Sequence, residues 1–277
     1  MPMTIATNVA SLNAQRVLGG TQNSLNVSMQ RLSSGLRVNS SKDDAAGLAI
    51  AERMEAQRRG MNMAVRNGND AISLAQTAEG ALGRIGESLQ RMRELAVQAA
   101  NATNTSSDRN NLNQEYSQLA AEVTRVIDAT TFNGNDLLKG TANLEFQVGA
   151  NNAASTDVVS IQIANMNSAS LAAALSDSLT GGDSSNALEA ITNLDGAIDE
   201  VTSQRAVFGG AQSRFESIVS QLQVAAENQA ASRGRIMDAD FAVETSNLSR
   251  TQILQQAGSA MVAQANQMPN QVLQLLR

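Results

Sequence analysis

The chain has 277 residues and a formal net charge of −6 at pH 7, and it contains no Cys, His or Trp. Without Cys and His it lacks the usual nucleophile–base pairs and nearly all ligands of zinc and transition metals, so we expect no enzyme, no cofactor and no metal site. The acidic balance and the scattered basic residues argue against nucleic-acid binding, and no long apolar window predicts insertion into a membrane.

An amphipathic stripe is the first element expected, within residues 1–41. It is too short, and carries too little apolar bulk, to form a stable core alone, so it needs partner helices. The first residues include neither a basic segment nor an apolar run, and we expect no cleavable signal peptide. The stripe consists of Ile5, Val9, Leu12, Leu25, Met29, Leu32 and Leu36.

A heptad pattern follows a polar hinge near residue 41. Between positions 71 and 99 small or apolar residues recur at alternating spacings of four and three, as a helix in lasting contact with another helix requires. The pattern stops at a polar stretch from Asn101 and resumes over residues 112–126. We expect an antiparallel helical hairpin that ends at a turn at Asn133-Gly134.

The segment 141–186 has no heptad pattern and a different composition. Apolar and polar residues alternate over 144–148 and again over 159–163, which predicts a β-hairpin. The Ser-, Ala-, Asp- and Gly-rich residues 165–186 are interpreted as a surface excursion that ends at a helix cap near Asn186.

The longest heptad pattern covers residues 187–226 and predicts a helix of about 60 Å, interrupted in its seam by Arg205 and Gln212. A second hinge near residue 236 precedes a C-terminal stripe, in which Pro269 should break or bend the helix. This stripe and the closing leucines are Leu254, Met261, Met268, Val272, Leu273, Leu275 and Leu276.

The hinges lie at similar distances from the two ends, so we expect the termini to pair as one unit. The predicted fold class is mainly α, with long coiled-coil helices that form a rod, a small β-hairpin and paired terminal helices. Residues 1–41 and 236–277 would form a terminal-helix polymerisation domain, residues 42–140 and 187–235 a coiled-coil rod domain, and residues 141–186 a short variable region.

Short strings at both ends of the chain resemble bacterial flagellin. They are residues 11–16 (SLNAQR), 32–37 (LSSGLR), 43–51 (DDAAGLAIA), 90–98 (QRMRELAVQ) and 274–277 (QLLR). The resemblance covers roughly residues 1–140 and 187–277, so the chain looks like a short form with a reduced central region.

The resemblance implies a structural subunit that polymerises into the flagellar filament for motility. Its terminal helices would line the inner tube and become ordered on assembly, in a coupled folding and binding reaction. It also implies type III export to the extracellular flagellum, with the export chaperone, the filament cap and the hook-junction proteins as partners besides other copies of the chain.

Host sensors are a further implication of the resemblance. Arg91, Leu95 and Glu115 match flagellin positions that a host Toll-like receptor recognises and that overlap the axial polymerisation surface. Arg91 and Leu95 are one turn apart, on a face expected to lie off the seam. The leucines at 273, 275 and 276 resemble the segment that cytosolic inflammasome sensors recognise, although packing inside the tube explains them equally well.

Two other functions remain open from the sequence. A hook–filament junction protein shares the terminal helices, and a host-binding adhesin would use the same exposed residues as its primary role. The carboxylate pairs Asp43-Asp44 and Asp238/Asp240 are interpreted as helix caps, with Ser41 and Asp44 as a capping box.

Overall fold

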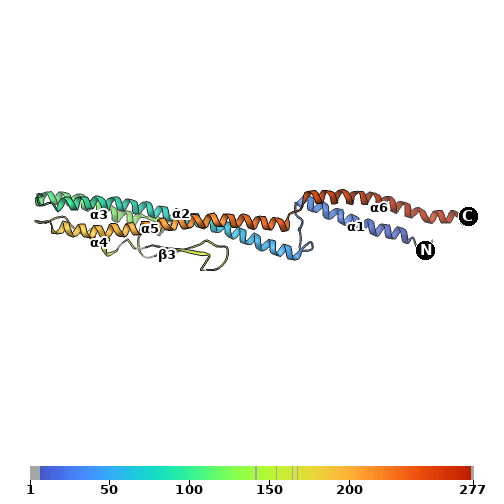
Figure 1. Cartoon of the computed structure of the whole chain (residues 1–277), viewed down its shortest axis with the longest axis horizontal. Coiled ribbons are helices and arrows are strands. Elements are labelled where there is room, and N and C mark those ends of the chain that lie inside the picture. Colours follow the sequence, from blue (N-terminus) through green and yellow to red (C-terminus); the bar gives the residue numbers. More distant parts are fainter. Residues whose placement is uncertain (1–6, 141, 154, 164, 167, 276–277) are drawn as a thin grey trace. The chain divides into compact units, whose positions relative to one another are not determined.

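The computed structural model describes all residues except 1–6, 141, 154, 164, 167, 276 and 277, and of residues 142 and 268–275 it describes only the backbone. The fold class is mainly α with a small antiparallel sheet, as predicted (Figure 1). The helices are α1 (Val9–Ser34), α2 (Ala45–Ala99), α3 (Ser106–Ala129), α4 (Ala169–Ser176), α5 (Ser185–Met237) and α6 (Phe241–Leu275). The strands are β1 (Thr131–Phe132), β2 (Asn135–Asp136), β3 (Ala142–Gln147) and β4 (Val158–Ile163).

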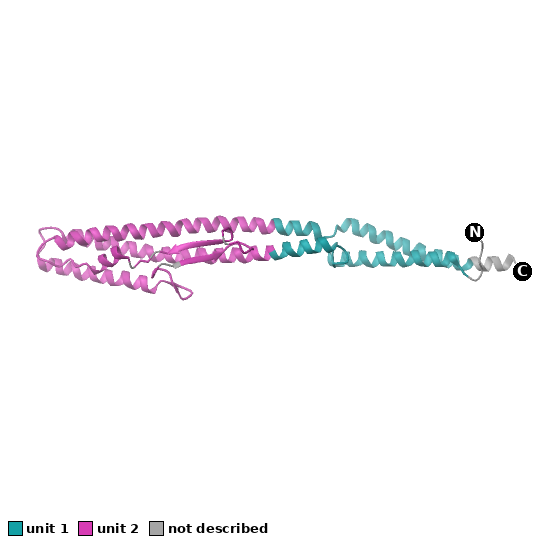
Figure 2. Ribbon diagram, turned by 90° about the horizontal axis from the view of Figure 1, so that it is seen from below, with its two compact units in different colours: residues 1–56, 228–277 teal, residues 57–227 magenta. Residues whose placement is uncertain are grey.

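The chain divides into two compact units (Figure 2). Unit 1 consists of residues 1–56 and 228–277, and unit 2 consists of residues 57–227. Both ends of the chain therefore belong to one unit, while α2 and α5 contribute residues to both. The three-part division expected from the sequence stays a prediction.

Helix α2 buries the heptad seam in unit 2. All nine predicted seam positions between 71 and 99 are buried, from Ala71 to Ala99. Helix α5 buries residues spaced by seven along the same core, among them Leu194, Val201 and Phe208. Small alanines allow helix backbones to approach closely, and the larger side chains fill the remaining space.

The polar residue Arg205 does not enter this core. It lies at the surface of α5, where its Nη2 donates to Glu79 Oε1 of α2 at 3.0 Å. The pair links two helices across the edge of the seam, which is how a polar residue can occupy a seam position at little energetic cost.

Helix α3 begins with a capping box that the sequence analysis missed. The Thr105 side chain accepts from Asp108 N, and the Asp108 carboxylate accepts from Thr105 N. The buried face also differs from the prediction, because Ala120 and Ile127 are buried while Leu119 and Val126 are only half-buried. The helix is thus rotated slightly from the strict heptad register.

The predicted β-hairpin is confirmed. Strands β3 and β4 pair antiparallel, with Leu144 opposite Ile161, and the buried side chains of β4 face the core. Phe146 packs edge-to-face on Phe215 of α5, with ring centroids 5.5 Å apart. A second, two-residue hairpin joins β1 to β2 at Asn133 and Gly134, where φ is 49° and 80°. Positive φ at both positions is typical of a type I′ turn.

The interpretation of residues 165–186 as a surface excursion is wrong. This segment contains α4, and its Leu171 and Ala174 are buried together with Leu179. The hydroxyl of Tyr116 donates to Ala174 O at 2.6 Å, and burial raises the pKa of that hydroxyl. Small and polar residues hid the helix in the sequence, because its burial depends on contact with α3.

The start of α5 agrees with the prediction in position but not in the role of Asn186. The helix begins at Ser185, whose backbone N–H donates to the Asp183 carboxylate at 3.3 Å. The amide of Asn186 instead donates to the Thr180 carbonyl. The helix therefore begins near Asn186, as predicted, but the Asn186 side chain holds the preceding loop.

Two chain segments of unit 1, residues 35–38 and 237–239, contact each other at a site that we call the joint. Gly35 ends α1 in the left-handed conformation, at φ 72°, and its carbonyl accepts from Ala239 N at 2.9 Å. Leu36 forms an antiparallel bridge with Asp238. Val38 is buried nearby with Met237, so the segment before α2 and the segment before α6 are held together.

Two of the four carboxylates expected to cap helices do so, namely Asp44 and Asp240, whereas Asp43 accepts from Asn39 N and Ser40 N of the preceding loop. Asp44 accepts from Gly47 N at 2.8 Å and Asp240 accepts from Ala242 N at 2.9 Å. The expected capping box of Ser41 with Asp44 is wrong, because α2 begins at Ala45 and Asp44 itself is the cap. Helix α6 continues through position 269 to Leu275, so a break at Pro269 is wrong, while the alternative of a bend there stays a prediction.

Candidate functional site

Helices α1 and α6 of unit 1 lie side by side and run antiparallel (Figure 1). Polar side chains connect them at intervals along their length. Near the start of α1, Ser11 Oγ donates to Asn266 Oδ1 at 2.6 Å. Further along, Gln255 Nε2 donates to Gln22 Oε1 at 2.6 Å.

The contact between α1 and α6 is made mainly of small and polar residues, together with the buried Leu25. Buried positions include Ser11 and Ser28 of α1 and Glu244 of α6. Gly258 allows a close approach, because a Cβ there would lie 3.0 Å from Leu18 Cδ1. Such a seam buries little apolar area, so the pair gains little hydrophobic stabilisation from its own contact.

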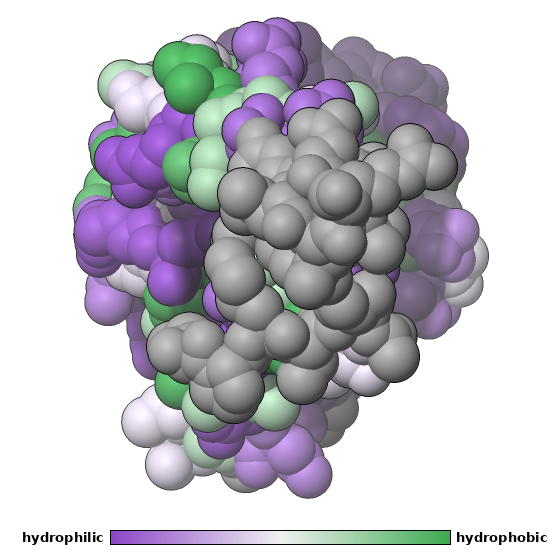
Figure 3. Space-filling view, turned by 90° about the vertical axis from the view of Figure 1, so that its right-hand side faces the viewer, coloured by the Kyte–Doolittle hydropathy of each residue, from purple (hydrophilic) through white to green (hydrophobic). Residues whose placement is uncertain are grey.

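Large apolar side chains of the pair point outward instead. Ile253 is 66% exposed and Met261 is 62% exposed, far more than is usual for residues of this kind. The exposed set comprises Val9, Leu12, Val17, Val27, Met29, Phe241, Val243, Ile253, Leu254 and Met261. In the end-on view of Figure 3, apolar surface is visible in several areas between hydrophilic side chains.

The predicted stripe residues divide between these two environments. Leu25 is buried in the helix contact, and Leu32 and Leu36 are half-buried. The exposed ones are Val9, Leu12, Met29, Leu254 and Met261. Ile5 and Leu276 lie outside the described residues, as do the side chains of Met268, Val272, Leu273 and Leu275.

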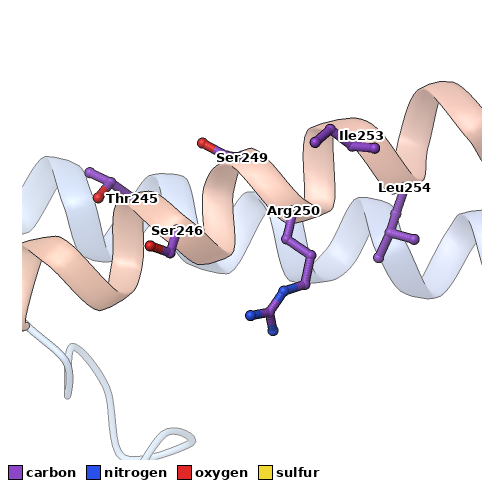
Figure 4. A pocket seen from close by; sticks show the side chains of 6 residues that line it. All are labelled: Thr245, Ser246, Ser249, Arg250, Ile253 and Leu254. Atoms are coloured by element: carbon purple, nitrogen blue, oxygen red, sulfur yellow. The ribbon is translucent and has the colours of Figure 1, made fainter.

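Shallow grooves follow the pair. One groove of about 550 Å³ is lined by both helices and includes Val17, Leu254 and Met261. A second, of about 540 Å³, runs along α6, where Ile253 points to one side and Arg250 and Leu254 to the other (Figure 4). Charges are sparse, since Arg16, Arg31, Glu244 and Arg250 are the charged residues of α1 and α6.

A charged cluster on α2 and α3 contains two of the predicted receptor residues. Arg91 donates to Glu115 Oε1 through Nε at 3.0 Å and through Nη2 at 2.9 Å, and to Glu94 Oε2 through Nη1 at 2.9 Å. The hydrogen bond to Glu94, and to a smaller extent the hydrogen bonds to Glu115, raise the pKa of Arg91. All three side chains are about half exposed or more, so a binding partner can reach them.

Leu95 does not belong to this exposed cluster. It is 1% exposed and lies in the core of unit 2, so the expectation that it shares an exposed face with Arg91 is wrong. Position 95 follows the seam residue Met92 by three and precedes Ala99 by four, which places it on the same helical face as both. The buried face of α2 is wider than a strict heptad seam.

The described helices include none that is long and apolar enough to cross a membrane. Within the described part of the chain, no three acidic, His or Cys side chains are grouped so as to hold a metal ion.

Two family models match the chain. The model for the bacterial flagellin N-terminal helical region matches residues 5–143. The model for the bacterial flagellin C-terminal helical region matches residues 191–276. The unmatched middle contains β4 and α4.

Similar proteins match over nearly the whole chain. A flagellin of Halalkalibacterium halodurans is 45% identical, and a flagellin of Bacillus subtilis is 40% identical; each match covers 99% of this chain and 100% of the relative. The flagellar filament 33 kDa core protein of Treponema phagedenis is 41% identical over the same shares. A solved structure of a putative flagellar hook-associated protein from Vibrio parahaemolyticus has a TM-score of 0.57 at 14% identity, covers 71% of this chain and 100% of its own, and shows likeness of fold alone.

Proposed function

The chain belongs to the bacterial flagellin family and is a structural subunit of the flagellar filament, and we propose that its α1–α6 pair is the surface through which copies polymerise. The observation that carries this proposal is the inverted distribution of side chains in the pair. Its internal contact is mainly small and polar, while most of its large apolar residues, such as Ile253 and Met261, are exposed.

This distribution has a physical consequence. Exposed apolar surface of this extent marks an interaction site in a soluble protein. Contacts between different surfaces of identical subunits generate an open helical array when the rotation does not close. Because α1 and α6 carry few charges, apolar packing supplies most of the contact energy that we assign to them.

Substitution of two outward residues tests this surface. In the variant Leu254→Ser with Met261→Ser, each change is expected to remove about 1 kcal/mol of apolar burial from the subunit contact. The critical monomer concentration for seeded polymerisation should therefore rise about thirtyfold. The matched control is Leu254→Met with Met261→Leu, which keeps apolar bulk and should assemble normally. A critical concentration that stays the same in the Ser variant would contradict the proposed surface.

Family membership also supports the remaining roles that we propose. They are type III export to the extracellular flagellum, contacts with the export chaperone, the filament cap and hook-junction proteins, and the absence of a catalytic role. Relatives named as flagellins and as a filament core protein favour a filament subunit over a hook–filament junction protein. Counting copies in isolated flagella separates the two, since a junction protein forms one ring.

We further propose that Arg91, Glu94 and Glu115 form the contact for a host Toll-like receptor. Arg91 presents a planar guanidinium, and Arg is a common anchor of protein interfaces. Leu95 does not face the receptor, because its side chain packs into the core of unit 2. It supports the contact by anchoring the part of α2 that carries Arg91 and Glu94. The inflammasome contact through Leu273, Leu275 and Leu276 stays a proposal that rests on the family resemblance.

A reporter cell line for the receptor tests this contact. Arg91→Ala should lower signalling potency by tenfold or more, because truncation of an Arg anchor removes a large share of interface energy. Arg84→Ala is the matched control, since Arg84 is also an exposed α2 residue that pairs with a Glu three positions on. Equal potency of Arg91→Ala and wild type, or an equal loss in Arg84→Ala, would contradict the receptor assignment.

A further inference from the structure

An ion pair with a buried carboxylate lies in the α1–α6 contact, and its Arg31 side chain is 32% exposed. Glu244, the only acidic residue of the two helices, is 6% exposed, and its Oε2 lies 3.8 Å from Arg31 Nη1. Among the described residues, Arg31 Nε is buried without a hydrogen-bond partner. Both side chains line a pocket of about 400 Å³ between the helices, which is otherwise lined mainly by small polar residues such as Ser28 and Asn247.

Stability does not explain this pair. Burial of the Glu244 carboxylate carries a desolvation penalty, which a half-buried Arg31 at 3.8 Å compensates poorly. Two apolar residues of similar size would stabilise the contact at least as well. The best attested use of a buried polar group between helices is instead to determine their register.

The other contacts of the pair discriminate weakly between registers. A shift of α6 by one turn, about four residues, would replace the Gln22–Gln255 contact by Gln22 with Thr251 or Ser259. Both of these hydroxyls can accept or donate a hydrogen bond. Neutral polar residues are so frequent along both helices that several registers satisfy them.

The ion pair does discriminate. In the register shifted by one turn that brings Arg31 opposite Leu248, Glu244 would reach Gly35, so the two charges would separate and the buried carboxylate would lose its cation. In the opposite shift Glu244 would face Val27 while Arg31 would face Asp240, so Glu244 would again lose Arg31 as its partner. An unpaired buried charge is far more costly than a lost neutral hydrogen bond.

We propose that Arg31 and Glu244 are positioning residues that determine the register of α1 against α6. The backbone bond from Ala239 to Gly35 holds the adjoining ends of the helices, and the ion pair is the side-chain contact that extends this register into them. The register matters because the groove with Val17, Leu254 and Met261 combines residues of both helices. This consequence rests on the proposed role of the pair in polymerisation.

The absence of Cys in the chain makes the register directly measurable. Leu18→Cys with Gly258→Cys reports the observed register, because these positions are in contact. Leu18→Cys with Val262→Cys reports the register shifted by one turn. The ratio of the two disulfide formation rates is measured in the full-length free chain and in seeded filaments, in backgrounds with and without the ion pair.

We expect the observed register to cross-link at least tenfold faster than the shifted one when Arg31 and Glu244 are present. In Arg31→Leu with Glu244→Leu the ratio should fall at least fivefold, and in the charge swap Arg31→Glu with Glu244→Arg it should recover. The register proposal would be overturned if the ratio of disulfide formation rates stayed the same in the double Leu variant. It would also be overturned if the two rates were equal in the chain that keeps Arg31 and Glu244. A lowered ratio with normal filaments would overturn instead the link between register and assembly.

Discussion

Deleting α6, residues 241–277, is expected to abolish filament assembly and to leave unit 2 folded. The deletion removes one half of the α1–α6 pair and the outward residues from Phe241 to Met261. Helix α1 alone would then expose both its seam and its outer face, and it would lose the tertiary packing that supplies most of the stability of a helix in a protein. Deleting residues 1–34 should have the same effect, because the pair needs both helices.

Sedimentation after seeding measures assembly, and Tyr116 reports the folding of unit 2. Tyr116 is the only Tyr in a chain without Trp, and it is buried against α4 with its hydroxyl bonded to Ala174 O. Its near-ultraviolet signal should melt at the same temperature in both truncated chains as in the full chain. Normal filaments from either truncated chain would refute the assignment of assembly to the pair.

Arg109→Met is expected to destabilise unit 2 by about 3 kcal/mol or more. Arg109 lies on α3, is 4% exposed, and reaches three carbonyl groups. Its Nε donates to Ala99 O at 3.0 Å, its Nη1 to Gly181 O at 3.4 Å and its Nη2 to Asn101 O at 3.5 Å. Ala99 is the last residue of α2, so its carbonyl has no partner within the helix.

Removal of the guanidinium would leave the Ala99 carbonyl buried and without this partner, and would free the loop around Gly181 from the end of α2. A loss of 3 kcal/mol corresponds to a melting temperature lower by about 6–12 °C in a unit of this size. Arg109→Lys should give an intermediate value, because one ammonium cannot reach all three carbonyls.

Arg125→Met is the control for this measurement. Arg125 is on the same helix, and its exposed guanidinium pairs with Glu122 one turn away. Exposed pairs of this kind contribute little to stability, so its melting temperature should stay near that of the wild type. Equal melting temperatures for Arg109→Met and Arg125→Met would contradict the structural role of Arg109.

Elements with a long and regular pattern were predictable from the sequence. The spacing from Ala71 to Ala99 predicted the buried face of α2, and the alternation in β3 and β4 predicted their pairing. Each pattern repeats often enough to exclude other periods. The same spacing placed Leu95 outside the seam, because a heptad template counts two positions in seven while the core around α2 covers more of the helix.

Elements whose burial depends on a distant neighbour were not predictable. Helix α4 has few large apolar residues, and it is held by Tyr116 of α3 and by its own cap at Ser168. Arg109 carries no signal in the sequence, since nothing local distinguishes a buried Arg from an exposed one. Both cases arise from contacts between residues that are far apart along the chain.

The terminal helices show the division most clearly. The sequence by itself determined that both ends are amphipathic helices of the flagellin type, because periodicity and the strings at each end are local properties. Only the tertiary structure decided which face is inside, with Ser11, Ser28 and Glu244 in the contact and Met29, Ile253 and Met261 outside. The reason is that burial depends on which face meets a neighbour, and a helix with apolar residues on several faces leaves that choice to its partners.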